Sequence, residues 1–105
     1  MAGKTRKQQI EEMLAEEPND PELRYALAME FVSAGQDESA VRSFQELNAA
    51  SPDYVPAYFH LAKALGRLGR TDEAREVARR GIVTAGTRGD LHAAEELGAL
   101  LDSLE

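Results

Sequence analysis

Apolar residues recur three and four positions apart along nearly the whole chain, and polar or charged residues fill the positions between them. An α-helix with this spacing gathers its apolar side chains on one face, where a neighbouring element can cover them. The strict alternation of apolar and polar residues that a half-buried strand requires is almost absent. The pattern therefore predicts an all-α fold.

Start and stop signals divide this pattern into about six helices. Thr5, followed three residues later by Gln8, has the form of a capping box that opens a first helix ending near Pro18. Asp20 caps a second helix, which carries Pro21 in its first turn and ends at a turn glycine.

The remaining helices are predicted by the same signals. The third starts at Asp37, the fourth follows an Asp53 cap, Thr71 opens the fifth, and the last follows an Asp90 cap after a loop over residues 86–89. The same spacing predicts which side chains face inward. In the two end helices these are Ile10, Met13, Leu14, Leu91, Ala94, Leu97, Leu101 and Leu104.

Comparison of residues 18–51 with residues 52–85 shows five identities at an offset of 34 residues. A fixed period between about 20 and 50 residues indicates a repeat architecture. The identities fall on two helix contact points, a turn glycine, a close-packed alanine and a terminal proline. The pairs are Leu27 with Leu61, Ala28 with Ala62, Gly35 with Gly69, Ala40 with Ala74, and Pro18 with Pro52.

These are the signature positions of the tetratricopeptide repeat, a helix-turn-helix unit of about 34 residues, and the chain resembles that family. The first copy departs from the family pattern at Arg24, where tryptophan is frequent, and at Leu47, where alanine is frequent. The second copy has Ala78, Gly81 and Gly86 in place of an aromatic residue, an alanine and a proline. The resemblance implies antiparallel helix pairs stacked as a short right-handed superhelix.

The repeat register treats residues 1–105 as one domain with two full and two half repeats. Extending the register outward places Met13 opposite Leu47, and the last helix fits only at an offset of 36, which implies two extra residues in the loop around Thr87. The segments are an N-terminal half-repeat helix at 4–17, repeats at 19–52 and 53–86, and a C-terminal half-repeat or capping helix at 88–105.

In this family the first helix of each repeat lines a concave groove, so the resemblance implies an adaptor or scaffold that binds a peptide or protein there. The groove positions in this sequence are Tyr25, Met29, Phe59, His60, Lys63 and Arg67, and less directly His92 and Glu95. Aromatic anchors dominate the energetics of interfaces, which favours such a role for Tyr25 and Phe59. Both could instead be packing residues, because they neighbour core positions.

The best-characterised clamp of related domains holds a chaperone C-terminal carboxylate with lysines, asparagines and arginine. This chain has Tyr25, Met29 and His60 at clamp positions, so that ligand is not expected. With Lys63 and Arg67 at one side, the groove instead predicts a peptide with apolar anchors and some acidic residues. The alternative function is self-association as a homodimer, which would cover the faces that so few repeats leave open.

Composition narrows the partners. Nineteen acidic and twelve basic residues give a net charge of −7, which argues against nucleic acid or an anionic membrane as the main partner. Without cysteine there is no disulfide, thiolate metal site or thiol nucleophile. No apolar run approaches the roughly 18 residues of a membrane span. We therefore expect a cytoplasmic protein without a secretory signal.

The sequence contains no candidate catalytic residues. His60 and His92 stand in separate elements, which disfavours a metal site or a general base, and no phosphate-binding loop or nucleophile elbow is found. The arginines between residues 67 and 80 alternate with acidic residues, as on a solvated helix face. The sequence therefore predicts a non-enzymatic protein without cofactors.

Stacked repeats bury their faces only on neighbours, and about three repeats are needed for stability. We therefore expect a chain of residues 19–86 alone to melt about 10 °C or more below residues 1–105, since each kcal/mol lost lowers the midpoint by several degrees. Circular dichroism melting measures this. Equal midpoints and equal cooperativity would show that the end helices are dispensable.

Overall fold

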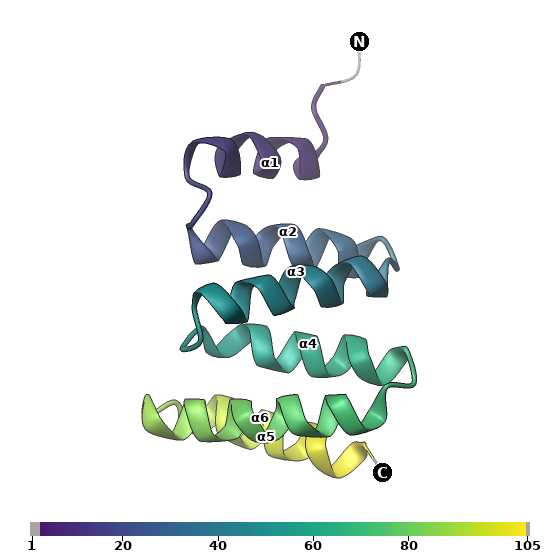
Figure 1. Cartoon of the computed structure of the whole chain (residues 1–105), viewed down its shortest axis with the longest axis vertical. Coiled ribbons are helices and arrows are strands. Elements are labelled where there is room, and N and C mark those ends of the chain that lie inside the picture. Colours follow the sequence, from purple (N-terminus) through teal and green to yellow (C-terminus); the bar gives the residue numbers. More distant parts are fainter. Residues whose placement is uncertain (1–2, 105) are drawn as a thin grey trace.

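The computed structural model describes residues 3–104, which form a stack of α-helices joined by short turns (Figure 1). The all-α prediction is confirmed, since the described part of the chain contains no β-strand. Every helix there also falls short of the length and apolar character that a bilayer-spanning segment requires. The helices are α1 (Arg6–Glu16), α2 (Pro21–Ser33), α3 (Asp37–Ala50), α4 (Val55–Arg67), α5 (Thr71–Thr87) and α6 (Leu91–Ser103).

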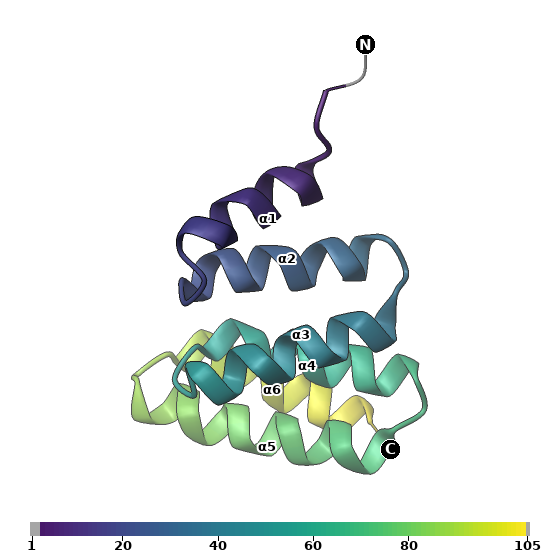
Figure 2. The ribbon, with the colours of Figure 1, turned by 45° about the horizontal axis from the view of Figure 1, so that its top comes forward.

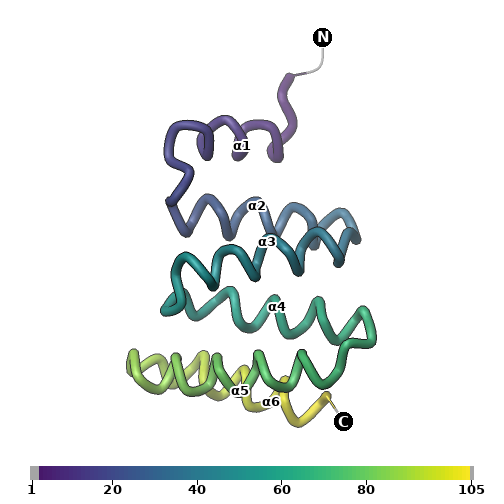
Figure 3. The backbone as a smooth tube through the Cα atoms, viewed as in Figure 1, coloured from purple at the N-terminus to yellow at the C-terminus, as the bar shows by residue number. Residues whose placement is uncertain are grey.

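Each helix packs against the next one in the chain, and the backbone follows a zigzag (Figure 3). The stack measures 47 × 28 × 20 Å, with α1 at one end and the α5–α6 pair at the other. In addition, α4 contacts α6, and Figure 2 shows both behind α3 and α5. Residues of α2, α4 and α6, the first helices of successive pairs, line one hollow, so these helices share one side of the stack.

Local signals set most helix starts as predicted. The Thr5 hydroxyl accepts the backbone N–H of Gln8, whose side chain accepts the N–H of Thr5, so the capping box is confirmed. Asp20 and Asp90 accept N–H groups from the first turns of α2 and α6. Each cap satisfies donors that have no partner within the helix and contributes about 1 kcal/mol.

Two glycines make equivalent turns one repeat apart. Gly35 and Gly69 have φ angles of +74° and +77°, a left-handed conformation that other residues rarely adopt. In both turns the residue after the glycine donates its N–H to the carbonyl oxygen five positions earlier, at 2.9 Å. This hydrogen bond and the left-handed glycine are the features of a Schellman turn, so the period of 34 is a period in backbone geometry too.

The predicted Asp53 cap is wrong. Tyr54 takes the N-cap position without a side-chain hydrogen bond, and α4 begins at the next residue. With Asp53 as the cap, Pro56 would stand third in the helix, where it has no N–H to offer for one of the two hydrogen bonds that a capping carboxylate can accept. The Asp53 carboxylate instead accepts a hydrogen bond of 2.9 Å from Arg88 in the α5–α6 turn.

The start of α5 is as predicted, but its end differs from expectation. Thr71 is its first residue, with Arg70 at the N-cap position, and the helix continues through Gly86 to Thr87, where a loop was predicted. Ala85 is fully buried, so packing outweighs the roughly 1 kcal/mol that a glycine costs in a helix. The turn is made by Gly89, whose φ is +73°.

The core is continuous from α2 to α6, with its most buried side chains on α3, α4 and α5. Two predicted core positions are wrong, because Met13 is 49% exposed and Leu91 is 71% exposed. Met13 lies on α1, where Ile10 is the buried residue, and Leu91 opens α6 at an end of the stack. Neither has the neighbour on both sides that the corresponding inner positions have.

Gly81 marks a close approach of helices in the core. A Cβ atom added there would lie 2.7 Å from Tyr58 Cβ and 2.9 Å from Leu97 Cδ1, closer than such atoms can pack. The family's alanine does not fit at this position because α5 passes so near to α4 and α6. The departure from the repeat pattern is therefore required by this packing.

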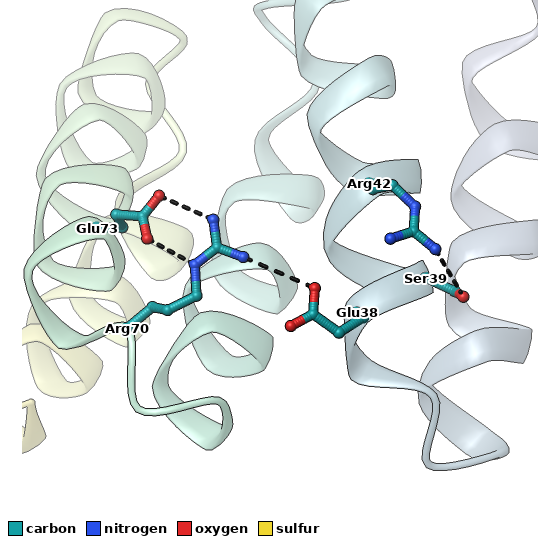
Figure 4. Close-up of polar contacts among 5 residues, drawn as sticks. All are labelled: Glu38, Ser39, Arg42, Arg70 and Glu73. Atoms are coloured by element: carbon teal, nitrogen blue, oxygen red, sulfur yellow. Dashed lines mark hydrogen bonds and ion pairs between the residues drawn. The ribbon is translucent and has the colours of Figure 1, made fainter.

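Polar contacts join consecutive repeats at their turns. Arg70 binds Glu73 of α5 with two hydrogen bonds of 2.6 and 2.9 Å, and its Nη1 lies 3.9 Å from Glu38 of α3 (Figure 4). Arg42 donates to Ser39 within α3 in the same view. Exposed pairs of this kind contribute about 0–1 kcal/mol each, so they add little to the stability of the stack.

The approach at Gly81 gives a stability prediction with a matched control. Gly81→Ala forces α4 and α6 outward and should lower the free energy of unfolding by about 1–3 kcal/mol despite alanine's higher helix propensity. Gly98→Ala, in open space within α6, should raise it by about 0.5–1 kcal/mol. Urea unfolding of both variants measures the difference. Equal effects would mean that the close approach carries no energetic weight.

Candidate functional site

Two adjoining hollows lie on the α2, α4 and α6 side of the stack. The first has a volume of about 290 Å³ and the second of about 380 Å³. Both include Phe59 and Glu96, so they form one depression, which we term the α4–α6 furrow. The first hollow is lined by Tyr25, Val55, Pro56, Phe59, His60, Asp90, His92, Ala93, Glu96 and Leu97, and the second by Phe59, Lys63, Glu96, Ala99 and Leu100.

Helix periodicity explains which side chains reach the furrow. In α4 the buried positions include Tyr58, Leu61 and Leu65, which face the packed interior. Each residue advances about 100° around a helix, so the residues next to these positions lie on another side. Phe59 and Lys63, four residues apart, therefore share the side that lines the furrow.

An aromatic cluster anchors the first hollow to the core. It consists of Tyr25, Phe44, Tyr54, Phe59 and His60, with ring centroids 5.3–6.1 Å apart in each contacting pair. The Phe44 ring is completely buried and stacks on His60, which meets Phe59 edge to face. Such pairs contribute about 0.5–1.5 kcal/mol beyond their burial, so the cluster presents a pre-formed surface.

The surroundings of His60 keep its imidazole neutral. Burial lowers the pKa of His60 below its ordinary value of 6.5, and the positive charges of Lys63 and Arg67 lower it further. The Glu96 carboxylate acts in the opposite direction. A neutral ring can lie among aromatic side chains at a smaller desolvation cost than a charged one.

The two tyrosines of the cluster also stay neutral. Burial raises the pKa of Tyr25, and the neighbouring Tyr54 adds to this effect. Burial raises the pKa of Tyr54 as well, with further increases from the carboxylates of Glu22 and Asp20. Two carboxylates therefore lie near Tyr54, at the edge of the aromatic cluster.

The structure brings together four of the six side chains predicted for the groove. Tyr25, Phe59 and His60 line the first hollow, and Lys63 lines the second, with its Nζ 5.4 Å from the centroid of the Phe59 ring. Met29 lines neither hollow and packs, partly buried, against the core. Tyr25 and Phe59 are partly exposed, so each of them both packs on the core and borders the open hollow.

Arg67 is held away from the furrow. Its Nε and Nη2 atoms donate to both carboxylate oxygens of Asp37 on α3, at 2.9–3.1 Å. A planar guanidinium paired in this way with a carboxylate is geometrically well matched. Arg67 therefore fixes the end of α4 to α3.

On α6 the predicted Glu95 is exposed and lines neither hollow, whereas Glu96 lines both. Under the offset of 36, Glu96 corresponds to His60, so the repeat register contained the signal. His92 does line the first hollow, and its Nε2 lies 3.3 Å from Glu96, which gives it the carboxylate companion that the sequence pattern did not reveal. Tyr54 of the aromatic cluster was not predicted as a site residue, because it lies before the first residue of α4, where helix periodicity does not indicate which way a side chain faces.

The described side chains do not form a group that could bind a metal ion. Over residues 3–104 there is no group of three or more histidine, cysteine, aspartate or glutamate side chains placed to hold a metal ion. What the furrow offers is a rigid aromatic wall, apolar side chains and a few charged groups at its margins, which suits non-covalent recognition.

Known proteins resemble this chain in sequence and in structure. The family model described as tetratricopeptide repeat matches residues 31–97. A TPR repeat-containing protein of Pseudomonas aeruginosa is 31% identical over 96 residues, covering 91% of each chain. The crystal structure of a tetratricopeptide repeat domain protein from Salinibacter ruber is 38% identical with a TM-score of 0.77, covering 81% of this chain and 96% of that one. The solution structure of a Bordetella parapertussis protein, 26% identical, reaches 0.85 and covers 97% and 89%.

The lowered pKa of His60 predicts a pH dependence of stability. Between the pKa of the folded state and 6.5, the unfolded chain binds more protons at His60 than the folded chain does. This contribution is therefore fully present above pH 6.5 and is lost as the pH falls through the folded pKa. Urea unfolding at several pH values should show a shallower loss for His60→Phe than for the wild type.

His92→Gln provides the control, because His92 has an exposed side chain on the same furrow. A slope that disappears with His92→Gln and survives in His60→Phe would contradict the assignment.

Proposed function

The chain belongs to the tetratricopeptide repeat family, and we propose that it is a protein interaction module that holds a segment of another protein in the α4–α6 furrow. One observation carries this proposal: Tyr25 of α2 and Phe59 and His60 of α4 converge on one open hollow. Large aromatic side chains that border open space on a fixed support are typical of binding surfaces.

The dimensions of the furrow favour peptide side chains over a whole small molecule. Its hollows, of about 290 and 380 Å³, lie at the lower end of the roughly 300–1,000 Å³ of small-molecule pockets. They follow one another along the space between α4 and α6, so neighbouring side chains of one segment can occupy them in turn. The role is therefore binding, and no catalytic step is assigned to it.

Preorganisation supports the same role. The Tyr25 and His60 rings already contact the buried Phe44, so little conformational freedom remains to be lost when a segment binds. We place the module in the cytoplasm, which the absence of cysteine from the sequence favours.

Site-specific photo-cross-linking tests the proposal. A benzophenone amino acid replaces Phe59 in the furrow in one variant and Arg79, exposed on α5, in another. After irradiation in a lysate of the source cells, adducts with other proteins should form at position 59 and be at least several-fold weaker at position 79. Mass spectrometry identifies the adducts.

Two results would contradict the proposal. Equal adducts at both positions, or none at either, would remove the furrow from consideration as the binding site. An adduct of twice the chain mass of 11.5 kDa, formed at position 59, would support the homodimer alternative instead. Light scattering of the unmodified protein at several concentrations then measures that self-association directly.

A further inference from the structure

The charges along the α4–α6 furrow are mainly negative. Asp90 and Glu96 line it, and Lys63 is the one lysine or arginine among its described lining residues. The carboxylates of Asp20 and Glu22 lie near Tyr54, beside the aromatic cluster. A segment that enters the furrow therefore meets more carboxylates than cations.

One of the two cations expected from the sequence is engaged elsewhere. Arg67 donates three hydrogen bonds to Asp37, whose side chain is only 18% exposed. Releasing Arg67 for an acidic ligand would leave the Asp37 carboxylate without its partner. The prediction of a ligand with acidic residues thus loses one of the two positive charges on which it depended.

The remaining cation shows what the furrow wall attracts. The Lys63 ammonium lies 5.4 Å from the centroid of the Phe59 ring, within the distance of a cation–π contact. Phe59 borders both hollows, as does Glu96. An aromatic face and a carboxylate that meet in one depression are complementary to a positively charged group with an aliphatic stem.

We propose that the segment bound in the furrow carries a lysine or arginine next to an apolar residue. The apolar side chain fills the first hollow against Tyr25 and Phe59, and the cation lies between the Phe59 ring and the Glu96 carboxylate. This inference rests on the proposed function and adds the chemistry of the partner. The net charge of −7 also favours encounter with a basic segment.

His60 and His92 fit this occupant. His60 stays neutral in the aromatic cluster, so it adds no positive charge to the furrow at neutral pH. His92 is exposed and 3.3 Å from Glu96, a contact that an entering guanidinium or ammonium group can replace. The charged and titratable groups that face the cation are therefore Glu96, Asp90, His92 and Lys63.

Selection from a library of random short peptides, displayed on phage, tests both proposals separately. Peptides that bind the wild type are screened again on Phe59→Ala and on Phe59→Leu, which keeps an apolar side chain, with folding checked by circular dichroism. Peptides that require Phe59 should be enriched in lysine and arginine over aspartate and glutamate. Neutral or acidic peptides that require Phe59 would overturn this inference and leave the interaction function standing. No Phe59-dependent peptide at all would count against both.

Charge variants then test the mechanism with one synthetic peptide from that selection. Glu96→Gln should weaken its binding roughly threefold to fivefold, as loss of an exposed charge pair does. Glu76→Gln, an equal charge change at an exposed position on α5, should leave binding within about twofold because that charge is screened at a distance.

Lys63→Gln best distinguishes a basic from an acidic ligand, because the two should respond in opposite directions. It removes the resident cation from the Phe59 ring, so a basic peptide should bind more tightly, by a few-fold, whereas an acidic one would bind more weakly. Fluorescence polarisation measures all three variants at two salt concentrations. Weaker binding to Lys63→Gln together with unchanged binding to Glu96→Gln would overturn the inference.

Discussion

The fold depends on close contact between helices that cannot bury their apolar faces alone. Alanines with no exposed surface occur in α2, α3, α4 and α5, and Gly81 is smaller still. Small side chains let neighbouring backbones approach, and each helix then covers the apolar stripe of the next. The larger core residues, Phe44, Leu47, Leu65 and Leu97, fill the remaining space. Most of the hydrophobic stabilisation of the chain is therefore shared between neighbours.

The candidate site follows from the same constraint. A helix that is buried between two others still has one side left over, and stacking brings the free sides of α2, α4 and α6 together. The aromatic cluster connects this free side with the interior, because Phe44 belongs to both. Folding and the proposed binding thus use adjacent positions of the same helical turns, and the packing of the core sets the shape of the furrow.

Helix spacing, caps and the period of 34 were sufficient to predict the fold class, the helices and the turn glycines, because these depend on short-range chemistry. Contacts between segments far apart in the sequence were not predicted. Asp53 pairs with Arg88 and Arg67 with Asp37, and no local pattern announces either. On α6 the sequence prediction was wrong by one position, because it named Glu95 where Glu96 lines the furrow. The offset of 36 was set from the apolar residues alone, although it also places Glu96 opposite His60. The exposure of Met13 depends on what covers α1, which spacing does not encode.

Gly81 has a further consequence for the furrow, although it lies on α5, behind both walls. The space that its missing side chain leaves is occupied by Tyr58 of α4 and by Leu97 of α6, and Leu97 itself lines the first hollow. The size of the residue at this position therefore influences how far apart α4 and α6 lie, and with them the two walls of the furrow. An alanine there would hold the walls of the proposed binding site farther apart and admit bulkier segments, so that selectivity would depend on a residue that no ligand touches.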